Sequence, residues 1–255
     1  MQEQWMVAII IGVLQGIFEW LPISSEGNIT IALTALGSDP SQAVAYALFL
    51  HVGTALSATM YYRGEVWRIL SELPHWRPRD AFTSTPTLLF LGLATITSGL
   101  VGVAAYLALE QVVSILTGGA FILLIGILLV VTGIVQRSAT GIALGTRTSP
   151  SFVDAIIVGG LQGLAILPGV SRSGVTTSAL LFRGYDGPES FRLSFLLSIP
   201  AALGGGLIAV IDDGLVGVAP ESALLALIIA AVVGYLTIDL LMRVVRQVAF
   251  WAVCV

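Results

Sequence analysis

The stretch QGIFEWLPISSEGN, residues 15–28, interrupts a hydrophobic chain with polar side chains. It follows an apolar run at residues 7–14 and holds two glutamates, a proline, two serines and two glycines. Proline and glycine disfavour a continuous helix, and carboxylates inside a bilayer are costly unless they face water, a partner or a bound ion. We therefore expect a broken helix at this point, and we expect it to be functional.

The composition around this stretch is that of an integral membrane protein. Hydrophobic residues make up 56% of the 255 residues and charged residues only 10%, against about a quarter charged in soluble domains. The formal charge is −4, and all 11 basic residues are arginines that form no basic face for nucleic acid. Cys254 is the single cysteine and cannot form an internal disulfide. The N-terminal MQEQW lacks the basic region of a signal peptide, so we expect it to belong to the mature fold.

Five segments are apolar over a length that crosses a bilayer, about 20 residues. They are residues 43–62, 87–108, 112–136, 191–211 and 222–242. Arginines in the links after the first and third spans place those links in the cytoplasm, and the acidic links lie outside. Arg183 and Arg192 are interpreted as cytoplasmic anchors in the same way. Residues 244–255 begin like a sixth span but are too short to cross.

Two further regions, residues 5–37 and 152–184, are broken at about residues 22–27 and 168–174, and their arms are too short to span. The charge pattern places both ends of each region on one face, and the two faces are opposite. Both regions contain Gln-Gly, Leu-Pro and Ser-x-x-Gly at matching positions. The sequence therefore predicts an all-α integral membrane fold, an inverted-topology repeat with two re-entrant broken helices meeting near the midplane.

The predicted domain organisation follows from this repeat. Residues 1–255 form a single polytopic membrane domain, with repeat one at about 1–136 and repeat two at about 150–255. A run of three glycines, residues 204–206, lies inside the fourth span and indicates close helix packing rather than phosphate binding. The tryptophans expected at the membrane interface are Trp5, Trp20, Trp67 and Trp76.

The polar groups in the two breaks indicate phosphate chemistry. Glu19, Glu26 and Arg172 lie where an ionised group costs roughly 2.5–3.5 kcal/mol, and such groups are usually functional. An arginine suits phosphate because its planar fork donates two hydrogen bonds and stays charged. The short helix after the second break has free N-terminal amides that favour an anion. The hydroxyls in the two breaks are those of Ser24, Ser25, Ser171, Ser173 and Thr176.

These motifs carry a family resemblance. QGIFEWLPISSEGN resembles the first signature of the undecaprenyl-diphosphate phosphatase family, also called the bacitracin-resistance protein family, and PGVSRSGVT at 168–176 matches its second signature. The similarity extends over nearly the whole chain. It implies a plasma-membrane hydrolase that removes the terminal phosphate of a polyprenyl diphosphate and regenerates the carrier for cell-surface glycan synthesis. It also implies a divalent metal, Mg²⁺ or Ca²⁺, and an active site facing outside.

The resemblance also implies roles for individual residues. Glu19 would hold the metal with Gln15 beside it, Ser25 would be the nucleophile or a phosphate contact, and Arg172 would clamp the diphosphate. Further substrate contacts would come from Ser24, Asn28, Gly169, Ser171, Ser173 and Thr176.

One position departs from the family pattern. Where the family usually has Ser-Ser-x-Gly-His, this chain has Ser-Ser-Glu-Gly-Asn, a form associated with archaeal members. Asn28 cannot relay a proton. Glu26 on the same loop is the favoured substitute, and His51 within the first span is the other. A transporter or flippase that binds a polyprenyl phosphate remains an alternative function. A structural ion pair of Arg172 with a glutamate and a homodimer are also left open.

Overall fold

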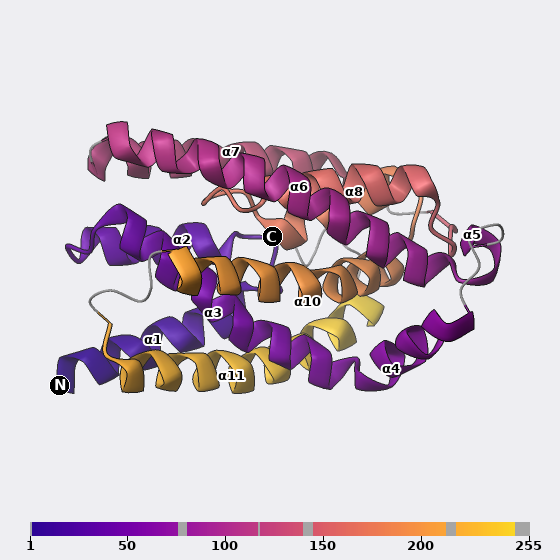
Figure 1. The fold of residues 1–255 in the computed structure, drawn as a ribbon, viewed down its shortest axis with the longest axis horizontal. Helices are drawn as coiled ribbons and strands as arrows, with labels where there is room; N and C mark the ends of the chain where they lie inside the picture. The colour runs from indigo at the N-terminus through magenta and orange to yellow at the C-terminus, as the bar shows by residue number, and fades with distance from the viewer. Residues whose placement is uncertain (1, 76–80, 117, 140–144, 213–217, 248–255) are drawn as a thin grey trace.

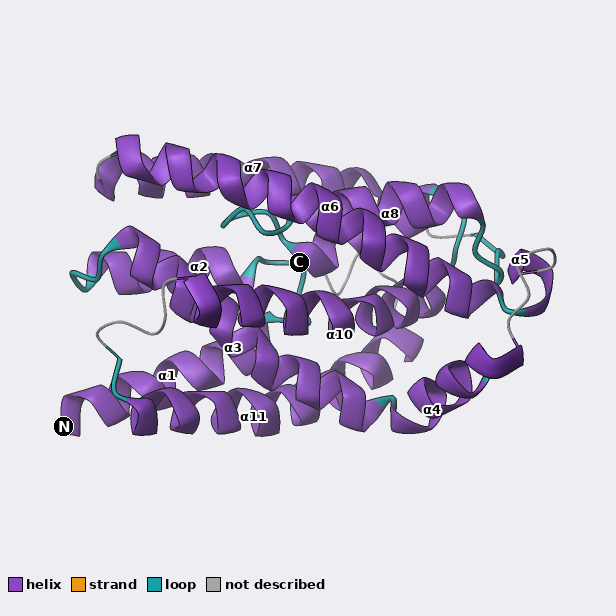
Figure 2. Cartoon of the chain, in the orientation of Figure 1, coloured by secondary structure: helices purple, strands orange, loops and turns teal. Residues whose placement is uncertain are grey.

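The computed structural model describes residues 2–75, 81–116, 118–139, 145–212 and 218–247, and these are helical apart from short links (Figures 1 and 2). Five of the described helices are long and apolar enough to cross a membrane. They are α3 (Pro40–Tyr61), α6 (Pro86–Ile115), α7 (Gly118–Ala139), α10 (Gly187–Asp212) and α11 (Pro220–Gln247). The predicted all-α class is confirmed, and each of the five predicted spans falls on one of these helices. The predicted start of the third span at residue 112 is wrong, because α6 continues through Ile115.

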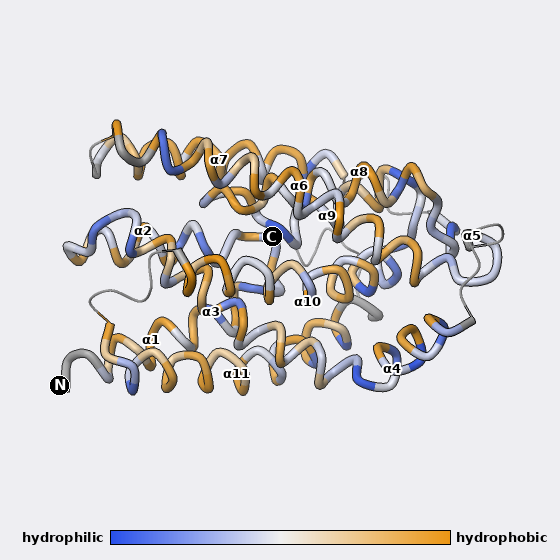
Figure 3. The backbone as a smooth tube through the Cα atoms, viewed as in Figure 1, coloured by the Kyte–Doolittle hydropathy of each residue, from blue (hydrophilic) through white to orange (hydrophobic). Residues whose placement is uncertain are grey.

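The shorter helices form two pairs and a link. The pairs are α1 (Gln2–Phe18) with α2 (Ser25–Ala35), and α8 (Phe152–Leu164) with α9 (Arg172–Phe182). The link after α3 holds α4 (Arg63–Ser71), the 3-10 helix η1 (Leu73–His75) and α5 (Ala81–Ser84). Figure 1 shows α4 and α5 at the end of the bundle opposite the N-terminus. Hydrophobic residues dominate the long helices, and hydrophilic ones gather on α4 and at the interior breaks (Figure 3).

Both helix breaks end earlier than the sequence analysis predicted. Helix α2 already begins at Ser25 and α9 at Arg172, inside the predicted breaks. The cause is a serine cap at each position: Ser24 Oγ accepts from the Gly27 amide, and Ser171 Oγ accepts from the Gly174 amide, both at 3.2 Å. A serine at this position satisfies a backbone amide that would otherwise lack a partner, so it fixes where the helix starts.

Each pair packs through glycines against a long helix of the other half of the chain. Helix α1 lies along α11, and α8 lies along α6. A Cβ atom on Gly16 would lie 2.8 Å from the Gly234 nitrogen, and one on Gly163 would lie 2.7 Å from the Ser98 oxygen. Only glycine allows backbones to approach this closely. Helix α3 packs against both α10 and α11 and so ties the two halves together.

The tryptophans divide between the exterior and the core of the helix bundle. Trp5 and Trp67 are 51% and 74% exposed, as expected of interfacial residues. Trp20 is fully buried and donates Nε1–H to the Gly234 carbonyl at 2.8 Å, so its predicted interfacial position is wrong. The break turns its ring inward against α11, where the indole N–H finds an acceptor. Trp76 lies outside the described residues.

Candidate active site

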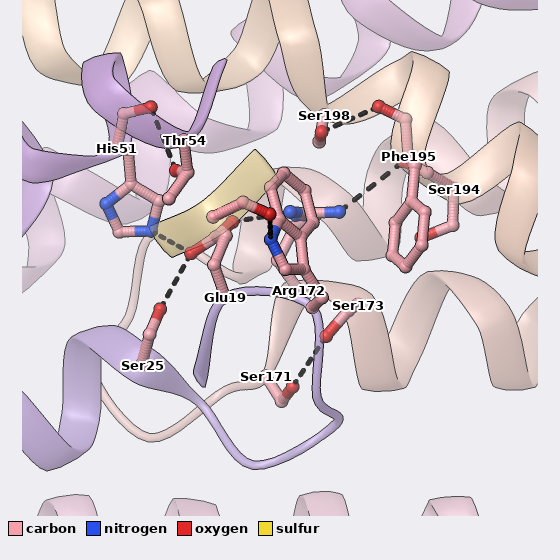
Figure 4. Close-up of polar contacts among 12 residues, drawn as sticks. Glu19, Ser25, His51, Thr54, Ser171, Arg172, Ser173, Ser194, Phe195 and Ser198 are labelled. Carbon is pink, nitrogen blue, oxygen red and sulfur yellow. Dashed lines mark hydrogen bonds and ion pairs between the residues drawn. The ribbon is translucent and has the colours of Figure 1, made fainter. Parts of the chain in front are cut away.

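The two helix breaks bring together an acid and a base from distant parts of the chain. Arg172 Nη2 donates to Glu19 Oε1 at 2.5 Å, across 153 positions of sequence (Figure 4). The side chains are 13% and 3% exposed. Removing one partner of such a buried pair would leave an uncompensated charge in a medium of low polarity. The predicted meeting of the two polar loops is therefore present as a direct contact.

The second oxygen of Glu19 is the centre of a polar cluster. Ser25 Oγ donates to Glu19 Oε2 at 2.7 Å, and Gln15 Nε2 donates to the same oxygen at 3.0 Å. His51 Nε2 lies 3.2 Å from this oxygen, while His51 Nδ1 lies 2.8 Å from the Ala47 carbonyl. Because both ring nitrogens face oxygen acceptors, the arrangement suits an imidazole that carries a proton on each nitrogen. A carboxylate is thus contacted by a hydroxyl, an amide and an imidazole.

Residues of helix α10 form hydrogen bonds that hold Arg172 in place. Arg172 Nη1 donates to the Ser194 carbonyl at 3.4 Å. Thr176 Oγ1 donates to the Arg172 carbonyl at 2.8 Å and lies 2.6 Å from Ser194 Oγ. Ser173 Oγ donates to the Leu21 carbonyl at 2.9 Å, which links the two breaks a second time. Thr176 therefore braces the start of α9 and is not at the surface of the polar pocket.

Most of the predicted site residues line one small polar pocket. It is lined by Glu19, Ser24, Ser25, Glu26, His51, Ser171, Arg172 and Ser173, among others. Gln15 contacts Glu19 but does not line this pocket. Asn28 uses its side-chain nitrogen inside the loop, donating to the Ile23 carbonyl at 2.8 Å and the Ser24 carbonyl at 2.9 Å. Glu26 and His51, the two candidates for proton transfer, both face the pocket.

The backbone at the pocket is tightly constrained. Ser24 has a φ of 56°, the only positive φ of a non-glycine residue in the described part of the chain. Strain of this kind persists only where the surroundings enforce it, and it is frequent at functional sites. Gly169 has a φ of 102°, and a Cβ on Gly27 would lie 2.8 Å from the Gly169 nitrogen. Gly27 thus lets the two loops touch. Gly169 has a structural role beside its predicted substrate contact, because its positive φ favours glycine and a Cβ atom there would lie 2.6 Å from the Ile125 carbonyl oxygen of α7.

A second buried charge cluster lies outside this pocket, and the sequence analysis missed it. Asp154 is fully buried and accepts from Arg183 Nε at 2.6 Å, Arg147 Nη2 at 2.8 Å and the Tyr185 hydroxyl at 3.0 Å. Burial alone would raise the pKa of Asp154, but the hydrogen bonds, that from Arg183 first and then those from Ser151, lower it to about 2. Arg183, interpreted from the sequence as a membrane anchor, therefore also pairs with a buried carboxylate. The Ser-x-x-Asp capping box at residues 151–154 was the available signal.

The oxygen atoms around Glu19 suit a hard divalent cation. Gln15 Oε1 and Glu26 Oε1 are buried without a hydrogen-bond partner. Mg²⁺ and Ca²⁺ prefer oxygen ligands, and Mg²⁺ in particular is often held by one or two carboxylates together with substrate phosphates. Over the described residues, no group of three or more His, Cys, Asp or Glu side chains is placed to hold a metal ion. These residues therefore fit a metal whose remaining ligands come from the substrate or from water.

The fold and the site define a class: a polytopic helical membrane protein in which two broken helices join an acid, an arginine and serines in a buried pocket. Residues 8–255 match the family described as bacitracin resistance protein BacA, so the chain belongs to that family. Among similar proteins, one from Haloarcula marismortui named undecaprenyl-diphosphatase is 52% identical over 98% of this chain and 93% of its own length. Relatives of the same name from Methanococcoides burtonii and Methanopyrus kandleri are 39% and 37% identical, over 97% and 99% of this chain and 93% and 92% of theirs.

Proposed function

We propose that this chain is a polyprenyl diphosphate phosphatase of the undecaprenyl type, which hydrolyses the terminal phosphate of a lipid diphosphate. The product is the monophosphate carrier used in cell-surface glycan synthesis. Family membership and the names of the relatives support the activity. The observation that carries it is the buried pair of Arg172 and Glu19 with Ser25 on the same carboxylate.

Arg172 is proposed to bind the diphosphate. Its guanidinium reaches the pocket from the first turn of α9, and it is held by the Ser194 carbonyl on the far side. Phosphate oxygens accept from a guanidinium as a carboxylate does, so the substrate would replace Glu19 as the partner of Arg172. An arginine on the transferred phosphoryl group also stabilises the charge that develops there, and phosphoryl transfer depends mostly on such stabilisation.

Ser25 is proposed as the nucleophile. Its hydroxyl already donates to Glu19 and lines the same pocket as Glu26, so the nucleophile is held beside the carboxylates of the site. Ser25 Oγ would bond to the terminal phosphorus and pass its proton to Glu26, the favoured group for proton transfer, while the bond from phosphorus to the bridging oxygen breaks and polyprenyl monophosphate leaves. Water would then attack the phosphoserine and lose a proton to a neighbouring carboxylate, Glu19 or Glu26. The bond from phosphorus to Ser25 Oγ would break, Ser25 would regain the proton that it had given up, and inorganic phosphate would be released.

The chemistry of the leaving group explains how the reaction tolerates Asn28. A phosphate monoester has a second pKa of about 6, so the departing lipid phosphate is stable as an anion near neutral pH. It therefore needs little help from a general acid. The demand for proton transfer falls on the hydroxyl or water that attacks, and Glu19 and Glu26 are the carboxylates in the pocket. We keep Glu26 as the favoured group, with His51 as the alternative.

A divalent metal, Mg²⁺ or Ca²⁺, is proposed as cofactor. Glu19 and the unpartnered Gln15 Oε1 would hold it, and Glu26 Oε1 is the other buried oxygen available. When bound, the metal would neutralise charge on the phosphate oxygens. Gln15 offers a neutral ligand rather than a second carboxylate, so we expect weaker metal binding than a Glu-x-x-x-Glu motif would give.

We also propose the inverted repeat. Helix α1 packs on α11 as α8 packs on α6, and Gly16 and Gly163 make equivalent close contacts at an offset of 147 residues. Ser24 and Ser171 cap α2 and α9 at the same offset. These relations support a repeat of two similar pairs. That the pairs are re-entrant and enter the plasma membrane from opposite faces, with the site open to the outside, is proposed from the arginine pattern and the family resemblance. A homodimer stays a prediction.

Labelling of single cysteines tests this topology. With Cys254 replaced, a cysteine at position 38 should react with an impermeant thiol reagent from outside the cell. A cysteine at position 149 should react only after the cytoplasmic side is opened. Labelling of both from the same side would contradict the inverted repeat.

Phosphate release by the purified protein tests the function. Reconstituted with Mg²⁺ or Ca²⁺ and a long-chain polyprenyl diphosphate, the chain should release inorganic phosphate. Arg172→Lys keeps the charge but loses the fork, so it should lose most turnover. Arg68→Lys, at a side chain 68% exposed on α4, is the matched control and should act like the parent. Movement of the intact lipid across the bilayer without phosphate release would favour the transporter instead.

A further inference from the structure

A cavity of about 240 Å³ continues from the polar pocket towards the outside of the helix bundle. It shares Glu26, His51 and Arg172 with that pocket. Beyond them it is lined by Ser98 and Gln162, and Gln162 Oε1 is buried without a hydrogen-bond partner. The rest of the lining on α6 and α10 is mostly glycines and apolar side chains, with Thr95 and Ser198 as the polar exceptions. The cavity therefore joins polar groups shared with the pocket to a largely apolar remainder, as a phosphate carrying a hydrocarbon tail requires.

The apolar end of the cavity reaches the surface between two candidate spans. Gly99 and Val103 of α6 and Gly204 of α10 line the cavity and are also exposed. Gly99 lies 13 residues from each end of the span Pro86–Val112. Gly204 lies seven residues before Ile211, the end of the other span, which is about 10 Å along the helix axis. This opening therefore faces the hydrocarbon of the membrane and not water.

The opening is clear because the residues that frame it are glycines, which have no side chains. A Cβ atom on Gly99 or Gly204 would meet no heavy atom within 4 Å. Gly206, by contrast, packs against α3, where an added Cβ would lie 2.3 Å from Val52 Cγ2. The predicted packing role of residues 204–206 thus holds for Gly206 and not for Gly204. Gly204 instead lines the opening.

The size of the cavity determines what fits in it. Pockets that enclose a drug-sized ligand measure about 300–1,000 Å³, so a cavity of about 240 Å³ holds a headgroup and the first part of a tail. A chain of many isoprene units must continue outside the protein. The opening between α6 and α10 leads from the cavity into the lipid phase, and the cavity shares Glu26, His51 and Arg172 with the proposed catalytic pocket.

We propose that the polyprenyl chain enters and leaves the site sideways through the opening framed by Gly99 and Gly204, and that these two glycines determine access for long-chain substrates. The inference rests on the proposed function for the identity of the lipid. The diphosphate sits at Arg172, the first isoprene units lie beside Gly99 and Gly204, and the rest of the chain stays in the bilayer.

Leucine substitutions test this opening. Gly99→Leu and Gly204→Leu place a branched side chain at the opening, so each should reduce kcat/KM for a long-chain polyprenyl diphosphate by about tenfold or more. Inhibition by inorganic diphosphate, which has no tail, should be unchanged in both. Gly92→Leu is the matched control: Gly92 lies two turns earlier on α6, is exposed, also has open space at Cβ and does not line the cavity. It should behave like the parent.

Two kinetic results would overturn the proposal. One is parental kinetics on the long-chain lipid in both leucine variants. The other is an equal loss of long-chain turnover and of inhibition by inorganic diphosphate, since that would mean that the leucines distort the polar pocket rather than block the tail.

A binding measurement separates this inference from the proposed activity. A polyprenyl diphosphate with a photoreactive diazirine near its headgroup should crosslink to α6 around Gly99 and to α10 around Gly204. This labelling does not require hydrolysis, so a chain that binds the lipid without cleaving it would contradict the proposed function and still support the opening. Crosslinks confined to α7 or α11 would overturn the opening even if phosphate were released.

Discussion

Asp154→Asn should destabilise the protein, because it removes the negative charge that pairs with two arginines where α8 begins and α9 ends. Asp154 at the start of α8 joins Arg147, which precedes that helix, to Arg183, which caps the end of α9. Asparagine keeps the size of the side chain and one acceptor oxygen. It removes the negative charge, however, and its NH₂ group, itself a hydrogen-bond donor, would face the donors of the arginines. The two arginines then lose their partner at the base of the pair that carries Arg172.

The size of the effect follows from the carboxyl pKa. That pKa is lowered from 3.8 to about 2, and each unit corresponds to about 1.4 kcal/mol, so the upper estimate is about 2.5 kcal/mol. Arg147 and Arg183 are 36% and 34% exposed, and solvent screening reduces this to about 1–2 kcal/mol near neutral pH. For a domain of this size that corresponds to a loss of about 2–8 °C in Tm.

The pH dependence has a defined sign. The folded-state pKa lies below the unfolded value, so the contribution is fully present above about pH 4 and is lost as the pH falls through about 2. Thermal unfolding in detergent, followed by circular dichroism, should therefore give Tm values for the parent and Asp154→Asn that differ at pH 7 and converge between pH 4 and pH 2.

The matched control is Asp186→Asn. Asp186 is exposed just before the span of α10 and accepts from the Glu189 amide at 2.8 Å, and asparagine caps a helix about as well as aspartate, so this variant should keep the Tm of the parent. If Asp154→Asn matched the Tm of the parent at pH 7, or if the difference between them widened towards pH 2, the reasoning about this cluster would be refuted.

Further predictions concern the catalytic pocket, each measured as phosphate release by purified variants. Chelation of divalent metal should abolish turnover, and Mg²⁺ or Ca²⁺ should restore it. Glu19→Gln should need a higher metal concentration for the same rate, because a ligand charge is lost. Full activity in excess chelator would exclude a role for the metal. Glu26→Gln should cost about a hundredfold or more in turnover, the scale of a lost acid or base; an unchanged rate there, with a collapse in His51→Gln, would transfer the role to His51. Asn28→His should be tolerated and should partly rescue Glu26→Gln; no rescue in the double variant would exclude position 28 as a proton relay.

The architecture was predictable because each part of it has a local signature. The five spans follow from hydrophobic length, and the breaks follow from proline and glycine beside charged residues in apolar sequence. The contact between Glu19 and Arg172 was predictable because both charges lie in an apolar setting, where each needs a partner. The predicted ends of the breaks were wrong because proline and glycine were weighted above the serine caps Ser24 and Ser171.

Features that depend on the partner helix were not predictable in the same way. His51 lies on an ordinary span, and nothing in its neighbourhood of sequence says that it faces Glu19. Trp20 resembles an interfacial aromatic until α11 supplies the Gly234 carbonyl for its indole N–H. The role of Gly204 differs from that of its neighbour Gly206 only because α3 approaches one and not the other. In each case the deciding atoms belong to a distant part of the chain.

The charges of the pocket constrain the order of binding in the proposed mechanism. Glu19 contacts Arg172 and His51, so in this structure the carboxylate is already balanced by basic groups. A diphosphate that takes Arg172 as its partner leaves Glu19 beside additional negative charge, which is unfavourable in a buried site. A cation at Glu19 removes that conflict, because the carboxylate gains a new partner as it gives up the guanidinium. Metal and diphosphate are therefore expected to bind cooperatively, each raising the affinity of the pocket for the other.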